Sequence, residues 1–288
     1  MNFTLDTEEF NKAQSKNNVI NKLAFAVMLK FFQIENRYPT NADLIDQALI
    51  DSLTMQLNCH DSNLSNYDWS SNNRTVKRFH HEIRTLLGYR QMTLSDSQIL
   101  IAWLIDNVLP EAPTLIQSQV HAYEFLARNK IEPCTADQLE RYINKAYYNF
   151  EKQFFTGISR KLSIKTTESI DSLLEDTKEL DITETVDQST KDSNLDEKEE
   201  IIEDFAKVKL VHLKKGSAGV RLKNVKGEIA KLKRLRLVNL PTNLLVNVSR
   251  KLTIKYYNRI LAELPSGIKK HKADILYPTM AIFCHHRL

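Results

Sequence analysis

The sequence contains few of the turn-forming residues that β-rich folds need. Glycine occurs six times and proline seven times in 288 residues. Sandwiches and barrels need a turn about every 8–12 residues, so this scarcity argues against both. Because 42% of the residues are hydrophobic, the chain can bury a substantial core, and we predict an all-α fold.

Cysteines and long apolar runs are also scarce. Cys59, Cys134 and Cys284 cannot all pair and do not have metal-ligand spacing, which is typical of a reducing compartment. No apolar run approaches the roughly 20 residues of a membrane span. The first ten residues lack the basic and apolar regions of a secretory signal. We therefore expect a cytoplasmic protein with no membrane partner.

The motifs of common enzyme classes are missing. The sequence has no glycine-rich phosphate loop and no HExxH, CxxC or GxSxG pattern. Its histidine pairs, His80–His81 and His285–His286, are adjacent. Neighbouring side chains diverge by about 100° on a helix, so neither pair readily chelates one metal. We predict no catalytic residue, no cofactor, no metal site and no small-molecule substrate.

Charge is unevenly distributed along the chain. Residues 1–167 are balanced, residues 168–204 hold 3 basic against 15 acidic residues, and residues 205–288 hold 19 against 3. The middle stretch is also nearly free of aromatic residues, which favours an acidic linker with a short helix at 170–174. The last stretch predicts a basic helical segment with a polyanionic partner.

One stretch, Tyr67–Arg90, combines helix signals with apolar and basic spacing. Ser71, Asn72 or Asn73 can cap its N-terminus, and Gly88 can end it. An apolar stripe at helical spacing must face a core; it comprises Val76, Phe79, Ile83, Leu86 and Leu87. The opposite side carries Arg74, Lys77, Arg78, His81 and Thr85. This build is typical of a major-groove recognition helix, and a solvated basic face explains it equally well.

The flanking helices permit two helix-turn-helix arrangements. A core helix over 19–34 is followed by a helix that opens at Thr40 and by a polar connector over 58–66, which is longer than the usual 3–4 residues. A capping box of Ser95 and Gln98 precedes a third helix. Helix 114–128, a short turn and a long helix opening at Thr135 match the motif more closely. The long helix carries basic residues among tyrosines, which suits phosphate contacts; they are Arg141, Lys145, Lys152, Arg160 and Lys161.

Three further helices are expected beyond the acidic stretch. They cover 205–213, 228–240 and 244–264. The apolar run Tyr277–Phe283 near the end of the sequence is expected to need partners from outside the chain.

The residues YDWSSNNRTVKRFHHEIRTLLGYRQM resemble a stretch near the start of transposases of the Tn-three family. The shared order is a Tyr, an Arg-Thr pair, a His followed by Glu-Ile-Arg, and a Gly-aromatic-Arg. Other segments resemble the same family, namely KLAFAVMLKFFQIENRYP, ARNKIEPCTADQLERYINKA and FTGISRKLSIKTTESIDSLL. The resemblance covers residues 7–175 and extends more loosely into the basic segment.

This resemblance implies a helical region that recognises the terminal inverted repeats of a replicative transposon. In the family, cleavage belongs to a C-terminal RNase H-like domain whose acidic triad binds two magnesium ions. The chain stops before such a domain, so we expect a truncated, non-catalytic transposase in the bacterial cytoplasm, associated with the nucleoid. Its expected partner is double-stranded DNA, with a second copy or an intact transposase left open.

The expected organisation has four parts. Residues 1–92 and 93–167 form two helical DNA-binding subdomains with helix-turn-helix character, residues 168–204 form the acidic linker, and residues 205–288 begin a truncated domain. The candidate DNA contacts are Arg74, Lys77, Arg78, His81, Arg84, Arg37, Arg90, Arg128, Lys130 and Arg141. The sequence does not say which of them read bases and which contact phosphates.

Two other functions compete with end binding. One is a helical interaction scaffold whose basic tail binds nucleic acid nonspecifically. The other is an inhibitory fragment that occupies transposon ends or pairs with intact transposase. Tail-driven binding is almost purely electrostatic and falls steeply with salt, so sequence preference separates it from end binding.

Overall fold

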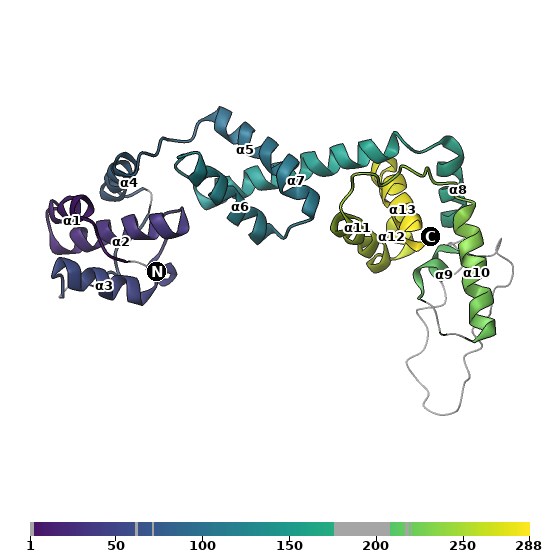
Figure 1. The fold of residues 1–288 in the computed structure, drawn as a ribbon, viewed down its shortest axis with the longest axis horizontal. Helices are drawn as coiled ribbons and strands as arrows, with labels where there is room; N and C mark the ends of the chain where they lie inside the picture. Colours follow the sequence, from purple (N-terminus) through teal and green to yellow (C-terminus); the bar gives the residue numbers. More distant parts are fainter. Residues whose placement is uncertain (1–2, 61–62, 71, 176–207, 217–218, 220) are drawn as a thin grey trace, which may run out of the picture. The chain divides into compact units, whose positions relative to one another are not determined.

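A computed structural model describes residues 3–60, 63–70, 72–175, 208–216, 219 and 221–288. This part of the chain is built from helices and contains no strand (Figure 1), which confirms the all-α prediction. None of its helices is long and apolar enough to cross a membrane. The chain forms two compact units. Unit 1 comprises Met1–Val108 and Pro113–Ala146, and unit 2 comprises Leu109–Ala112 and Tyr147–Leu288.

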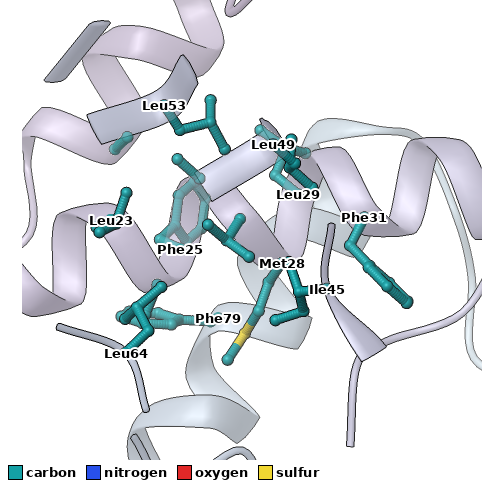
Figure 2. Close-up of a cluster of buried hydrophobic side chains, with 14 of the residues drawn as sticks. Leu23, Phe25, Met28, Leu29, Phe31, Ile45, Leu49, Leu53, Leu64 and Phe79 are labelled. Atoms are coloured by element: carbon teal, nitrogen blue, oxygen red, sulfur yellow. The ribbon is translucent and has the colours of Figure 1, made fainter. Parts of the chain in front are cut away.

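Unit 1 begins with helices grouped around one central helix. The first elements are α1 (Thr7–Gln14), α2 (Val19–Glu35), the 3₁₀ turn η1 (Ala42–Leu44), α3 (Gln47–Leu57) and α4 (Arg74–Leu86). Ten successive residues of α2, from Leu23 to Phe32, are buried, as the dense apolar run predicted. Both α1 and α3 pack against α2. Figure 2 shows Phe79 of α4 in the same apolar cluster as Phe25 and Met28 of α2.

The helix expected to open at Thr40 is interrupted, so that prediction was wrong in detail. The Asn41 side chain accepts a hydrogen bond from the Leu44 amide (3.2 Å) and closes η1. Ile45 is extended, and Asp46 then caps α3 through the Ala48 amide (2.9 Å). Asn and Asp side chains bond nearby backbone amides in competition with a continuous helix, and here they split it into two.

A buried ion pair joins α1 to α2. The Lys30 ammonium lies 2.7 Å from Glu9 Oε2, and both side chains are more than 90% buried. Glu9 also accepts hydrogen bonds from the Gln33 amide (2.6 Å) and the Asp6 backbone N–H (2.9 Å). The carboxylate therefore has three donors, whereas its cationic partner has one described acceptor.

The rest of unit 1 consists of α5, α6 and the first half of α7. Their bounds are Leu94–Asn107, Leu115–Arg128 and Ala136–Ser159. Helix α5 starts with a capping box of Thr93 and Asp96, not of Ser95 and Gln98 as predicted. Arg90 holds the Asp96 carboxylate with two hydrogen bonds of 2.6 and 2.7 Å, and this fixes the earlier start. Helix α6 begins after Thr114, as predicted.

Unit 2 contains the second half of α7 and the elements that follow it. These are the short turn η2 (Leu109–Glu111), α8 (Ile164–Glu175), α9 (Leu210–Lys214), α10 (Leu222–Arg236), α11 (Arg250–Ala262), α12 (Pro265–Ile268) and α13 (Ala273–Arg287). The short helix expected at 170–174 is part of α8. The remainder of the acidic linker, 176–204, and the start of the helix expected at 205–213 lie outside the described residues. The helices expected at 228–240 and 244–264 are α10 and α11, with different ends.

The apolar run near the end of the sequence finds its partners within the chain, which corrects the prediction. Residues Met280 to Cys284 of α13 are fully buried, and α13 packs against α11, α8 and α10 (Figure 1). The rings of Tyr257 and Phe283 stack with centroids 5.5 Å apart. The sequence does not reveal these partners because they lie on three separate helices, the first of which begins at Ile164.

Candidate nucleic-acid interface

Helix α4 has the ends that the sequence predicted. Of the three candidate caps, Asn73 is the one used, because its side chain accepts a hydrogen bond from the Thr75 amide (2.9 Å). Gly88 follows the last turn in the left-handed region with φ 69°, a conformation that glycine adopts without steric cost.

The apolar side of α4 is fixed in the core of unit 1. Val76, Phe79 and Ile83 are completely buried, and α4 packs against α2. The Phe79 ring meets Phe25 edge to face, with centroids 5.3 Å apart and an interplanar angle of 85°. The rotation of α4 about its own axis is therefore fixed, which fixes the direction of its other side.

That other side is a basic stripe open to solvent. Arg74, Lys77, Arg78 and His81 are all exposed, and their spacing of three or four residues places them on one face of the helix. Among the described residues, neither Arg74 nor Lys77 has an ion-pair partner. Arg78 lies 3.9 Å from Glu82, at the outer limit of an ion pair. We call these four residues the α4 stripe.

Arg84 was also a candidate DNA contact, but its charge is already paired. Arg84 Nη1 lies 2.6 Å from Glu132 Oε2, and only 14% of each side chain is exposed. Arg84 Nη2 is 2.8 Å from Nδ1 of His81. The guanidinium thus ties α4 to the segment after α6 and helps to orient one imidazole of the stripe.

Arg90 and Lys130 lie where the segment after α4 pairs with the segment after α6, which we call the junction. The Arg90 amide donates to the Lys130 carbonyl (2.9 Å), and the Glu132 amide donates to the Arg90 carbonyl (2.8 Å). The Arg90 side chain is engaged with Asp96. Lys130 has φ 53°, and its ammonium lies 4.7 Å from the centroid of the Tyr89 ring. Both cations are exposed, and the junction positions their backbones.

The remaining three candidates come from other elements of unit 1. Arg37 follows α2, 3.8 Å from Glu35 and with its guanidinium 5.6 Å from the Phe31 ring centroid. Arg128 ends α6, is exposed and lies 3.9 Å from Glu124. Arg141 is exposed on α7. The structure thus gathers four candidates on the α4 stripe and three at the junction, and helix-turn-helix character stays a prediction.

Two acids that shape the site gave no signal in the sequence. Glu132 neutralises Arg84 from 48 residues away. Glu82, the one acid on α4, pairs with the ammonium of Lys16, a buried side chain whose Nζ also lies 4.2 Å from the Phe25 ring centroid. The shortest contacts of both acids are to buried or half-buried cations, and Glu82 reaches Arg78 only at 3.9 Å, so the α4 stripe keeps a positive field.

His80 lies beside the stripe, on the half-buried side of α4. Its ring stacks on Tyr38 with centroids 3.6 Å apart and an interplanar angle of 9°. The Tyr38 hydroxyl donates to the His80 carbonyl (3.3 Å). The buried His80 Nε2 has no hydrogen-bond partner among the described residues. Burial, together with the charge of Arg84, lowers the pKa of His80 to about 4.

This histidine predicts a stability that falls in mild acid. An unfolded histidine titrates near pH 6.5, so between about pH 6.5 and 4 the unfolded state binds a proton that folded His80 does not. Stability is therefore complete above pH 6.5 and decreases as the pH falls toward 4, by up to about 1.4 kcal/mol per pH unit. Urea unfolding of unit 1 should show a loss of about 2 kcal/mol between pH 7 and pH 5.

The neighbouring histidine supplies a matched control for this measurement. His80→Phe should flatten the dependence between pH 7 and pH 5, because the phenyl ring can stack on Tyr38 and takes up no proton. His81→Gln changes an exposed residue and should retain the dependence. If His80→Phe keeps the full slope, another group is responsible.

The described residues contain no group of His, Cys, Asp or Glu that could hold a metal ion. Comparison of the sequence with known proteins gives a family and one relative. Residues 1–146 match a family model described as "Domain of unknown function (DUF4158)". The chain belongs to the DUF4158 family. The matched range includes α4 and every candidate residue named above.

This member of the DUF4158 family is also similar to a curated protein, "Transposase for transposon Tn1546" of Enterococcus faecium. The two are 24% identical over 172 residues, which is 60% of this chain and 17% of the transposase. The chain therefore matches about a sixth of the length of that relative. These comparisons show that the chain is related to transposases.

Proposed function

We propose that this chain binds the terminal inverted-repeat DNA of a transposon through the α4 stripe, as the N-terminal part of a transposase of the Tn-three type. The observation that carries the proposal is the geometry of α4. Three apolar residues anchor the helix in a core, and the opposite face is exposed and presents Arg74 and Lys77, which have no ion-pair partner among the described residues. The relationship to a transposase supports DNA as the polyanion.

The stripe suits base reading and backbone contact together. Arg74 and Arg78 are four residues apart, about 6 Å along the helix, and each guanidinium can bind guanine O6 and N7 with two parallel hydrogen bonds. Lys77 presents a point charge suited to phosphate. The stripe supplies no carboxylate pair of the kind that holds catalytic metals, so we assign it binding and no cleavage.

Partner and location follow from the same proposal. An end-binding protein would be associated with the nucleoid, and a second copy or an intact transposase would be needed to hold two ends together. A chain that occupies ends without cutting them would inhibit an intact transposase. Arg84 enters the proposal as a positioning residue, because its pairing with Glu132 fixes α4.

The test compares binding to a duplex that carries the inverted repeat with binding to a scrambled duplex of equal length. Arg74→Ala or Arg78→Ala should cost about 1–3 kcal/mol on the repeat and much less on the scrambled duplex. Lys77→Ala should weaken both alike. Lys270→Ala, which removes an exposed cation of unit 2, is the control and should change neither. Equal losses on both duplexes for both arginine variants would contradict base reading.

A second function is favoured by α10 in unit 2. This helix exposes four cations, Lys223, Lys226, Lys233 and Arg236, together with apolar side chains such as Leu222 and Ile229. Such a surface suits an interaction scaffold that binds nucleic acid or an acidic protein without reading sequence. The same pair of duplexes decides, since the scaffold would bind both equally and lose affinity steeply with salt.

A further inference from the structure

The second half of α7, which belongs to unit 2, bears a shallow hollow of about 430 Å³ on its surface. The hollow is lined by Asn149, Lys152, Gln153, Thr156, Gly157 and Arg160. These positions recur every three or four residues, so the first five lie on one face of α7, and Arg160 follows directly after the last residue of the helix. The lining contains two cations, two amides and a hydroxyl, and it contains no carboxylate.

Both cations of the hollow are available to a ligand. Lys152 and Arg160 are exposed, and among the described residues neither has an ion-pair partner. The adjacent Lys161 differs, because its ammonium donates to the carbonyls of Asn243 and Leu244, each at 3.0 Å. Lys161 therefore stabilises the fold of unit 2, whereas the side chains of Lys152 and Arg160 make no such contact in the described part of the chain.

Gly157 is a second and independent indication that a ligand binds this face. It lies near the end of a 24-residue helix, where glycine is less favourable than alanine. A Cβ built at Gly157 would meet no atom of the described residues within 4 Å, and its φ is not in the left-handed region. Neither internal packing nor backbone conformation therefore requires glycine here. A ligand that approaches the backbone closely would require it.

We propose that this face of α7 binds the sugar–phosphate backbone of duplex DNA, apart from the bases that the α4 stripe would read. Amides, hydroxyls and cations are the groups that proteins use for phosphate oxygens. From Asn149 to Arg160 the face is about 16 Å long, the axial length of four to five nucleotides of one strand at about 3.4 Å each. Its open, elongated form suits a strand better than a single phosphate ion.

This inference rests on the proposed function for its ligand, and the salt dependence of binding separates the two. The experiment uses the full chain, the repeat and scrambled duplexes, and 50–200 mM salt. Lys152→Gln with Arg160→Gln should weaken binding to both duplexes alike, by roughly tenfold at the lowest salt, and should reduce the slope of log K against log salt by about 2. Arg250→Gln with Lys270→Gln removes the same charges elsewhere in unit 2 and should leave the slope nearly unchanged.

Gly157→Ala tests the close approach without changing charge. It should raise the melting temperature of unit 2 by about 2–4 °C and weaken binding to both duplexes severalfold. A more stable protein that binds DNA as before would overturn the role of Gly157. An unchanged slope in the Lys152→Gln, Arg160→Gln variant would overturn the whole inference. Lack of preference between the duplexes would instead contradict the α4 proposal alone.

Discussion

Replacing Phe79 with alanine is expected to lower the free energy of unfolding of unit 1 by about 3–5 kcal/mol. The ring is completely buried and meets Phe25 edge to face, so the truncation removes apolar contacts from both α4 and α2. The cavity left by the substitution would lie under the buried face of α4, which sets the orientation of the α4 stripe. Affinity for the repeat duplex should therefore fall as well, even though Phe79 cannot touch DNA.

The two tryptophans make this measurement selective. Trp69 and Trp103 are the only tryptophans of the chain, and both lie in unit 1. Tryptophan fluorescence during urea unfolding therefore reports unit 1, whereas circular dichroism reports both units. The control is Tyr148→Ala, an exposed aromatic of unit 2, which should leave the tryptophan transition unchanged. A loss below about 1 kcal/mol for Phe79→Ala would mean that α4 is not anchored in this core.

The sequence predicted α4 well because the signals for that helix are local. Capping by Asn73 and termination at Gly88 depend on residues within one turn of each end. The apolar period identified Val76, Phe79 and Ile83 as buried without knowledge of what covers them. Exposure of the α4 stripe follows from the same period, since residues opposite a buried face meet solvent.

The features that the sequence missed depend on which acid pairs with which base. Arg84 has the same local pattern as Arg78, yet Glu132 claims it through a contact across 48 residues. Ser95 and Gln98 formed a valid capping pattern, but the capping box uses Thr93 and Asp96 because Arg90 holds the Asp96 carboxylate. In both cases an ion pair overrides a local helix rule: the Arg84–Glu132 pair spans 48 residues and the Arg90–Asp96 pair spans six. One sequence cannot show which acid meets which base.

The Lys30–Glu9 pair gives the second large expected effect, and its asymmetry can be tested. Glu9→Ala removes the one described acceptor of the Lys30 ammonium and leaves a buried charge unpaired, which costs about 3–5 kcal/mol. Lys30→Met is expected to cost less, about 1–3 kcal/mol, because the Glu9 carboxylate keeps the Gln33 amide and the Asp6 N–H as donors. Urea unfolding followed by tryptophan fluorescence at pH 7 measures both losses.

Glu124→Ala is the control for this comparison. It removes an exposed partner of Arg128 in the same unit and should cost no more than about 1 kcal/mol. The double variant Glu9→Leu, Lys30→Met should recover part of the loss of Glu9→Ala, because no charge is left buried. Recovery will be incomplete, since Gln33 and the Asp6 N–H lose their acceptor in the double variant too. Equal costs for Glu9→Ala and Lys30→Met would show that the two extra donors do not sustain the carboxylate, and that the pair stabilises α1 on α2 by charge attraction alone.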